Sequence, residues 1–304
     1  MSLGLLCPGQ GDQSSGMFDI LAGDAQAQTI LDIFTREMGD GPTRVAEDML
    51  HVNVIAQPLV CALQLATWAA LRGKDLPEPR AIAGYSVGEL AAYGCAGALA
   101  PGEVIQLAKR RAQEMDAATP GEGGLMAVRG LLLPTMRMLC EKFGVEIAIV
   151  NDFDRLVIGG PRAALAHCAE AATAAGAKVT PLNIAIPSHT SLMRPAVANF
   201  RAALEAAHWR APWTPVMAGT SGAPVYGKAE AINVLARQVA ETVNWAGCLD
   251  GLVEMGCTVL LELGPGAGLS RMARDRAPTI PARSVADFHS LDGVATWVGR
   301  QLQE

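Results

Sequence analysis

Short apolar runs alternate with longer amphipathic stretches along most of the chain, and this alternation predicts the fold class. The runs are almost continuous in apolar residues, which is typical of strands buried on both faces. Between most of them, apolar residues recur at i, i+3 and i+4 spacing, which predicts helices. This pattern indicates an α/β fold with a largely parallel central sheet. The predicted strands are Leu3–Cys7, Ala81–Gly84, Leu125–Val128, Glu146–Val150, Leu156–Gly159, Pro215–Ala218, Val259–Leu263 and Thr279–Arg283.

The middle of the chain has a different order of elements. There the pattern predicts a strand, a helix, two strands, a helix and a strand, which is the βαββαβ order of a ferredoxin-like unit. We therefore expect a small subdomain over residues 123–186, inserted into a large α/β domain made of residues 1–122 and 187–304. The elements that complete this order are helices at Leu133–Lys142 and Ala163–Ala175 and a last strand at Lys178–Ile184.

Composition narrows the class of partner. Half of the 304 residues are apolar but only 5% are aromatic, so Ala, Leu, Val and Ile are expected to fill the core. The mean hydropathy is +0.24 and the isoelectric point is about 5.4. A formal net charge of −6 argues against general attraction to nucleic acid or to an anionic membrane.

The longest nearly uncharged stretch, Val52–Leu71, contains Asn53, Gln57 and Gln64, so it predicts a buried helix rather than a membrane span. The N-terminus has no basic segment and no cleavage site, and we expect no signal peptide. Seven cysteines are scattered without a C-x-x-C pair, which predicts reduced core thiols in a cytoplasmic protein and no metal site.

A candidate nucleophile lies in Gly84-Tyr85-Ser86-Val87-Gly88, between a predicted strand and a predicted helix over Glu89–Ala98. G-x-S-x-G between a strand and a helix is the pattern of a nucleophile elbow. The helix N-terminus behind the serine offers backbone N–H groups to a developing oxyanion. The alternative is an ordinary glycine-rich turn with Ser86 as a helix N-cap.

A nucleophilic serine needs a base, and the chain has five histidines. His189 follows a predicted strand and precedes an amphipathic helix, so it lies in a loop at a strand end, where side chains can face a cleft. The alternative is a capping or surface histidine. The other four, in less suitable places, are His51, His167, His208 and His289.

Arg111 falls on the apolar stripe of a predicted helix, while Lys109 and Arg110 point elsewhere. A buried arginine needs an anion, because an unpaired buried charge is costly. That anion is either an internal carboxylate or a substrate. The planar guanidinium suits bidentate capture of a carboxylate.

Six segments, taken together, resemble the malonyl-CoA:acyl-carrier-protein transacylases. The resemblance runs in order along essentially the whole chain, with matching spacing between Ser86 and Arg111. Tyr85 departs from it, because the family has histidine before the nucleophile, and Val87 replaces leucine. The matching segments are Pro8-Gly9-Gln10-Gly11, GYSVGE at Gly84–Glu89, Arg111 with Met115, Pro187-Ser188-His189, Arg237-Gln238 and Glu262–Gly266.

The resemblance implies an α/β-hydrolase-like large domain and a role for each matching residue. It makes Ser86 the acylated nucleophile and His189 its base, oriented by a backbone carbonyl, with Gln238 lining that part of the site. It assigns the oxyanion hole to the backbone N–H groups of Gln10 and Val87.

The resemblance also assigns the substrate. Arg111 is implied to bind the malonyl carboxylate, and Asn151 to line the cleft from the small subdomain. Malonyl-CoA is the expected substrate, and no bound cofactor is expected. The expected partners are CoA and an acyl carrier protein with a CoA-derived prosthetic group.

GYSVGE and the late segment Arg283–Val294 look most like the transacylase (epsilon) subunit of bacterial malonate decarboxylase. This likeness implies transfer to the carrier subunit of that complex and contact with its other subunits. The alternative is a malonyl transacylase of fatty-acid synthesis.

Two functions of other classes also fit the sequence. An α/β-hydrolase esterase would order its triad as serine, acid and histidine, with Asp250 or Glu262 followed by His289. A non-catalytic module that binds CoA or a carrier protein is the other, although the reactive positions are all present.

Overall fold

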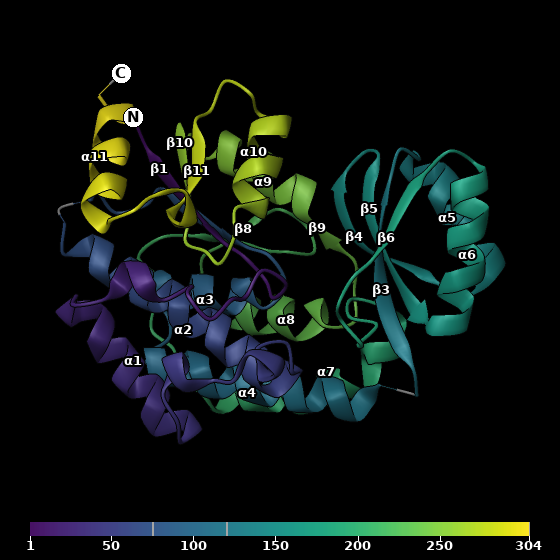
Figure 1. The fold of residues 1–304 in the computed structure, drawn as a ribbon, viewed down its shortest axis with the longest axis horizontal. Coiled ribbons are helices and arrows are strands. Elements are labelled where there is room, and N and C mark those ends of the chain that lie inside the picture. The colour runs from purple at the N-terminus through teal and green to yellow at the C-terminus, as the bar shows by residue number, and fades with distance from the viewer. Residues whose placement is uncertain (75, 120, 304) are drawn as a thin grey trace.

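The strands of the protein form two sheets (Figure 1). The computed structural model describes residues 1–74, 76–119 and 121–303. The larger sheet has the strand order β11-β10-β1-β2-β7-β8, and only the edge strand β8 is antiparallel to its neighbour. Its strands are β1 (Leu3–Cys7), β2 (Ala81–Gly84), β7 (Val216–Met217), β8 (Pro224–Val225), β10 (Val259–Glu262) and β11 (Ala282–Ser284).

Helices cover both faces of the larger sheet, because successive strand residues point to opposite faces. Leu5 of β1 belongs to the main core on one face, and Leu6 belongs to a second core on the other. The helices that contribute to the main core are α1 (Ala25–Met38), α2 (Asn53–Arg72), α3 (Gly88–Cys95), α4 (Pro101–Ala118), α7 (Arg194–Ala206), α8 (Lys228–Gln238) and α11 (Leu291–Gln301). The second core takes its helical residues from α9 (Trp245–Glu254) and α10 (Gly268–Arg276).

The smaller sheet has the strand order β6-β3-β5-β4-β9. Helices α5 (Leu133–Phe143) and α6 (Arg162–Ala174) cover its outer face and enclose a third core (Figure 1). Leu125 and Ile149, on its inner face, join the second core of the larger sheet. Its strands are β3 (Gly123–Arg129), β4 (Glu146–Asp152), β5 (Arg155–Pro161), β6 (Lys178–Pro181) and β9 (Val243–Asn244).

The edge strand β9 joins the smaller sheet to a distant part of the chain. It pairs in parallel with β4, and the Thr242 hydroxyl donates a hydrogen bond of 2.7 Å to the Ile147 carbonyl. The segment that leads into β9 begins at the end of α8, only a few residues earlier. The smaller sheet is therefore attached directly to the end of α8.

Every strand predicted from the sequence is present, although some boundaries differ. The predicted strand at Thr279–Arg283 begins too early, because β11 starts at Ala282, after a turn closed by Ile280 N–H and Ala277 O and after Pro281, which has no N–H to donate. The last strand of the smaller sheet ends at Pro181 rather than Ile184. Strands β8 and β9 were missed, since their two residues lie outside any longer apolar run, whereas β7, which is as short, lies within the apolar run Pro215–Ala218.

Helix α2 is the one described helix that is long and apolar enough to cross a membrane. In the relevant window 83% of its residues are buried inside the protein, which confirms the predicted core helix. All seven cysteines are free and buried.

Candidate active site

Ser86 lies at a strained turn between β2 and α3. Its φ of 55° is in the left-handed region, which non-glycine residues rarely adopt. The flanking glycines allow this turn: a Cβ on Gly84 would lie 2.2 Å from Glu89 Cα, and one on Gly88 would lie 2.0 Å from the Cys7 carbonyl oxygen. The G-x-S-x-G pattern therefore forms an elbow that lifts the serine above the end of the sheet.

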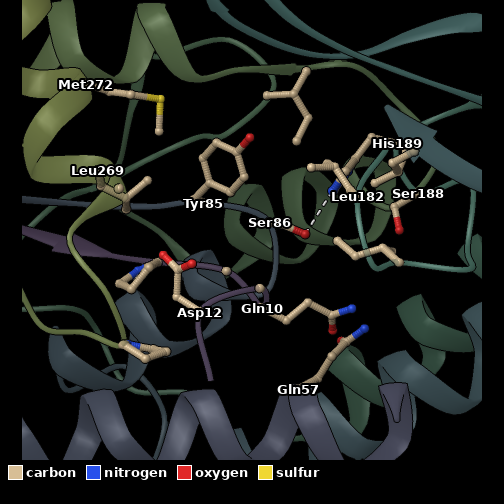
Figure 2. A pocket seen from close by; sticks show the side chains of 18 of the residues that line it. Gln10, Asp12, Gln57, Tyr85, Ser86, Leu182, Ser188, His189, Leu269 and Met272 are labelled. Atoms are coloured by element: carbon tan, nitrogen blue, oxygen red, sulfur yellow. Dashed lines mark hydrogen bonds between the residues drawn. The ribbon is translucent and has the colours of Figure 1, made fainter. Parts of the chain in front are cut away.

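His189 faces the serine. Its Nε2 lies 2.8 Å from Ser86 Oγ (Figure 2). Its Nδ1 lies 2.7 Å from the backbone carbonyl oxygen of Gln238. A carbonyl oxygen only accepts hydrogen bonds, so Nδ1 carries the proton and the Nε2 lone pair faces the hydroxyl. The His189 N–H donates to the Val239 carbonyl at 2.9 Å, and this bond holds the backbone at a φ of 62°. The structure thus orients the imidazole as a base for Ser86.

The environment keeps this imidazole neutral. Burial lowers the pKa of His189 to about 3, and the nearby charge of Arg111 lowers it in the same direction. The Gln238 carbonyl, which favours the protonated ring, has the smallest effect. His189 is therefore ready to accept a proton across the whole neutral pH range.

Arg111 is buried, with 2% of its surface exposed, and it points at the same serine. Its Nη1 donates to Gln57 Oε1 at 2.8 Å, and its Nη2 donates to Gln238 Oε1 at 3.0 Å and to Ser86 Oγ at 3.4 Å. Burial lowers its pKa to about 10, so the guanidinium is still charged near neutral pH. In the described part of the chain no carboxylate forms an ion pair with it. The internal-carboxylate alternative is therefore wrong for direct contact.

Gln57 is a site residue that the sequence interpretation did not assign. Its amide is almost fully buried near the start of α2, where it binds Arg111 through Oε1 and Asn53 Oδ1 through Nε2. The available signal was its position, because an amide on an apolar helix needs buried partners. In the sequence, the Gln57 amide indicated only that the stretch Val52–Leu71 does not span a membrane.

A pocket of about 220 Å³ opens over Ser86, His189 and Arg111. Figure 2 shows Tyr85, Leu269 and Met272 along one side of this pocket and His189 with Ser188 along the other. The smaller sheet and the segment after it contribute four apolar wall residues, and α10 contributes two. These residues are Leu125, Ile149, Leu182, Ile184, Leu269 and Met272.

Two backbone N–H groups near the serine remain available. The Gly9 backbone lies against Ser86, since a Cβ there would be 3.5 Å from Ser86 Cβ. Gln10 follows it and lines the pocket, and Val87 immediately precedes α3. Among the hydrogen bonds of the described residues, none has the N–H of Gln10 or Val87 as donor. Both N–H groups are therefore free to accept the role of oxyanion donor, which stays a prediction.

Asn151 is not among the residues that line this pocket. Its side chain lies near the hydroxyl of Tyr85, where it opposes the effect of burial, which raises the pKa of that phenol, and its Oδ1 is buried without a hydrogen-bond partner. The Tyr85 ring lies edge-on to Trp245 at 5.4 Å. Asn151 thus acts on the site from behind Tyr85, which itself lines the pocket. This contact links β4 of the smaller sheet to the elbow of the larger one.

The three residues of the esterase alternative are not assembled into a triad with Ser86: Glu262 lines the same pocket as Ser86, but Asp250 and His289 do not. His289 lines another cavity, of about 400 Å³. Asp250 forms an ion pair of 2.6 Å with Arg276, and Glu262 accepts the backbone N–H groups of Leu269 and Ser270 at the start of α10. The histidine that contacts Ser86 is therefore His189 and not His289.

The serine, the neutral histidine and the unpaired arginine define a site for acyl transfer from a substrate that carries an anionic group. The acyl transferase domain family matches residues 5–286 of the chain. The match spans nearly the whole chain and includes Ser86, Arg111, His189 and Gln238, whereas His289 lies outside it. This chain belongs to the acyl transferase domain family.

Named relatives agree with this assignment. The malonyl CoA-acyl carrier protein transacylase of Mycobacterium tuberculosis is 31% identical over 310 residues, which cover 96% of this chain and 99% of the relative. The protein of the same name from Salmonella typhimurium is 29% identical and covers 95% of this chain and 97% of the relative.

Solved structures give the same result for the fold. The acyl-carrier-protein S-malonyltransferase of Burkholderia pseudomallei superposes with a TM-score of 0.93 at 31% identity, over 97% of this chain and 100% of that chain. A malonyl transacylase in complex with a type II polyketide acyl carrier protein gives a TM-score of 0.93 at 28% identity, over 97% of this chain and 99% of that chain.

The low pKa of His189 predicts how the reactivity of Ser86 depends on pH. A neutral sulfonyl fluoride should modify Ser86 at a constant rate from about pH 8 to about pH 5, because the base stays unprotonated above a pKa of about 3. His189→Ala should slow the reaction by roughly 10²–10⁴-fold, and His289→Ala should leave it unchanged. A fall in rate centred near pH 6.5, or a loss with His289→Ala, would contradict the assignment.

Proposed function

We propose that this protein is a serine acyltransferase that moves a malonyl group from malonyl-CoA to the phosphopantetheine-type thiol of an acyl carrier protein. The observation that carries the proposal is the buried, unpaired guanidinium of Arg111 beside the Ser86–His189 pair. A malonyl thioester has the two groups that such a site requires, a carbonyl for the serine and a free carboxylate for the arginine. The names of the relatives support the same substrate and acceptor.

In the first half-reaction His189 Nε2 takes the proton of Ser86, and Oγ attacks the thioester carbonyl. The oxyanion is stabilised by the N–H groups of Gln10 and Val87. The C–S bond then breaks, and the imidazolium returns its proton to the CoA thiolate. The product is a malonyl ester on Ser86.

The second half-reaction reverses the first with another thiol. The carrier thiol gives its proton to His189 and attacks the ester carbonyl through the same oxyanion hole. The C–O bond breaks, Ser86 recovers the proton, and the malonyl thioester of the carrier leaves. Arg111 holds the free carboxylate through both halves and so selects malonyl over acetyl.

Two acceptors fit this chemistry. The relatives named above support an ordinary acyl carrier protein, as in a malonyl transacylase of fatty-acid synthesis, and we favour that acceptor. The carrier subunit of malonate decarboxylase is the second candidate, with the other subunits of that complex as further partners. Tyr85 in GYSVGE and the late segment Arg283–Val294 are the features that favour it.

We also propose that residues 123–186 form an inserted subdomain of ferredoxin-like type and that the protein works in the cytoplasm. The strand order β6-β3-β5-β4, with two helices on one face, supports the first statement. Seven unpaired buried thiols support a reducing compartment.

Intact mass after mixing with malonyl-CoA tests the covalent step. The wild-type protein should gain the mass of one malonyl group, and Ser86→Ala should gain none and lose nearly all transfer. A protein that binds malonyl-CoA without any adduct would be a binding module. An adduct that decays to free malonate at the same rate with and without a carrier would point to a hydrolase.

Carrier proteins of the two types test the acceptor. With equal concentrations of an acyl carrier protein of fatty-acid synthesis and a malonate decarboxylase carrier, we expect the fatty-acid type to gain the malonyl mass first. The reverse order would establish the decarboxylase assignment. Both carriers without their prosthetic groups serve as controls and should gain no mass.

Removal of Arg111 tests substrate selection. Breaking a buried charge pair costs about 3–5 kcal/mol, so Arg111→Gln should lower kcat/KM for malonyl-CoA by hundreds-fold or more. The rate of acylation by acetyl-CoA should change far less, since acetyl has no carboxylate to lose. Arg110→Gln, on the exposed face of the same helix, is the matched control. An equal loss with both substrates would mean that Arg111 supports only the fold.

A further inference from the structure

Glu89 is a buried acid next to the proposed site, and the mechanism above gives it no part. It lies on the first turn of α3, has no exposed surface, and accepts hydrogen bonds through Oε2 from Gln238 Nε2 at 2.7 Å and from the Gly219 N–H at 3.0 Å. Its other oxygen, Oε1, is buried and has no hydrogen-bond partner. Burial of a carboxyl group costs free energy of desolvation, so its presence here indicates a compensating interaction or a function.

The amide of Gln238 connects Glu89 to Arg111. Its Oε1 accepts from the guanidinium at 3.0 Å, while its Nε2 donates to Glu89 at 2.7 Å and to the Ser86 carbonyl at 2.9 Å. Arg111 and Glu89 are therefore opposite charges connected through one amide, without direct contact. A direct salt bridge would occupy the face of the guanidinium that a substrate needs, whereas this indirect pair leaves that face open.

Arg111 is the charged group that acts on Glu89 among the described residues. Burial raises the pKa of Glu89 to about 7, while the bonds from Gln238 and Gly219 and the charge of Arg111 lower it. Five other buried titratable groups around α3 stay neutral, because burial raises the pKa of the thiols and the phenol and lowers that of the imidazole. They are Cys7, Cys61, Tyr93, His189 and Cys248.

We propose that Glu89 is the counter-charge of Arg111 while the site is empty, and that it takes up one proton from solvent when a malonyl carboxylate binds the guanidinium. This inference rests on the proposed function. The arriving carboxylate and Glu89 would otherwise be two anions sharing one cation. A proton on Oε1 breaks none of the bonds that hold Gln238, because that oxygen has no partner. Glu89 is thus a positioning residue, since it acts on the substrate only through Gln238 and Arg111.

The sign of the pH effect follows from proton uptake. The complex with malonyl binds one proton more than the empty site, so malonyl affinity is greatest at low pH. It should fall by up to tenfold per pH unit as pH rises above the pKa of about 7. Acetyl-CoA carries the same CoA charges without the carboxylate, so its affinity should lack this dependence.

Calorimetry on the full-length Ser86→Ala protein measures the proton uptake and the affinity on ligand binding, because this variant cannot be acylated. We titrate it with malonyl-CoA and with acetyl-CoA at pH 7.5, in two buffers of different ionisation enthalpy, and repeat the Kd from about pH 6 to about pH 8.5. The expected result is a fraction of a proton, up to one, taken up with malonyl-CoA beyond that with acetyl-CoA. Equal proton uptake with both ligands, or a malonyl Kd that follows the acetyl Kd at every pH, would overturn the proposal.

Glu89→Gln in the same background is the matched variant, since it keeps an oxygen acceptor for Gln238 and removes the charge. It should bind malonyl-CoA with the same Kd at pH 8 as at pH 6, and it should match the parent at pH 6. If the affinity of the variant for malonyl-CoA were lower than that of the parent by the same factor at every pH, the role of Glu89 would be merely structural and the proposal would be overturned. If this variant does not fold, the comparison of the two ligands on the parent still decides.

Failure of the proposed function is a separate outcome. It would appear as no malonyl adduct on the wild-type protein, measured by intact mass. A normal adduct without the differential proton uptake would reject only the part assigned to Glu89.

Discussion

The site depends on one residue, Gln238 at the end of α8, which contacts the groups that define the chemistry. Its backbone carbonyl fixes the tautomer of His189, its amide oxygen binds Arg111, and its amide nitrogen binds the Ser86 carbonyl and the Glu89 carboxyl. A primary amide can do this because it offers an acceptor and two donors in one plane. The nucleophile, its base and the guanidinium are thus held by one side chain and its own backbone, rather than by a chain of acidic residues.

Burial then sets the charge state of each group. The imidazole is neutral because it is buried away from solvent and lies near a cation. The guanidinium remains charged because its pKa, although lowered, stays well above neutral pH. The two effects reinforce each other, since Arg111 disfavours protonation of His189. A single buried cation therefore attracts an anionic substrate and also keeps the base unprotonated.

The sequence was sufficient to single out Ser86, His189 and Arg111, which the structure brings together, because each is marked by a residue type in a constrained place: an elbow, a strand end and an apolar stripe. It was also sufficient for most strands, whose apolar runs are long enough to detect. It was not sufficient for contacts between distant segments. The sequence around Asn151 and around Tyr85 does not predict that these two side chains lie close together.

The same limit applies to the polar residues on buried helices. The position of Gln57 on an apolar helix shows that its amide needs a partner, but it does not say which one. Glu89 sits in the motif itself, yet its full burial becomes visible only when α3, α8 and the loop around Gly219 are packed together. The strands β8 and β9 are too short for any periodicity to reveal.

The attachment of β9 has a mechanical consequence. Val239, whose carbonyl anchors the backbone of His189, and Val243, which pairs with β4, are separated by three residues of chain. The three residues between Val239 and Val243 cannot extend much, so we expect a displacement of the smaller sheet to displace the imidazole as well. We therefore expect the width of the pocket and the alignment of the base to be coupled, so that a bulky substrate that displaces the wall of the pocket also displaces the histidine.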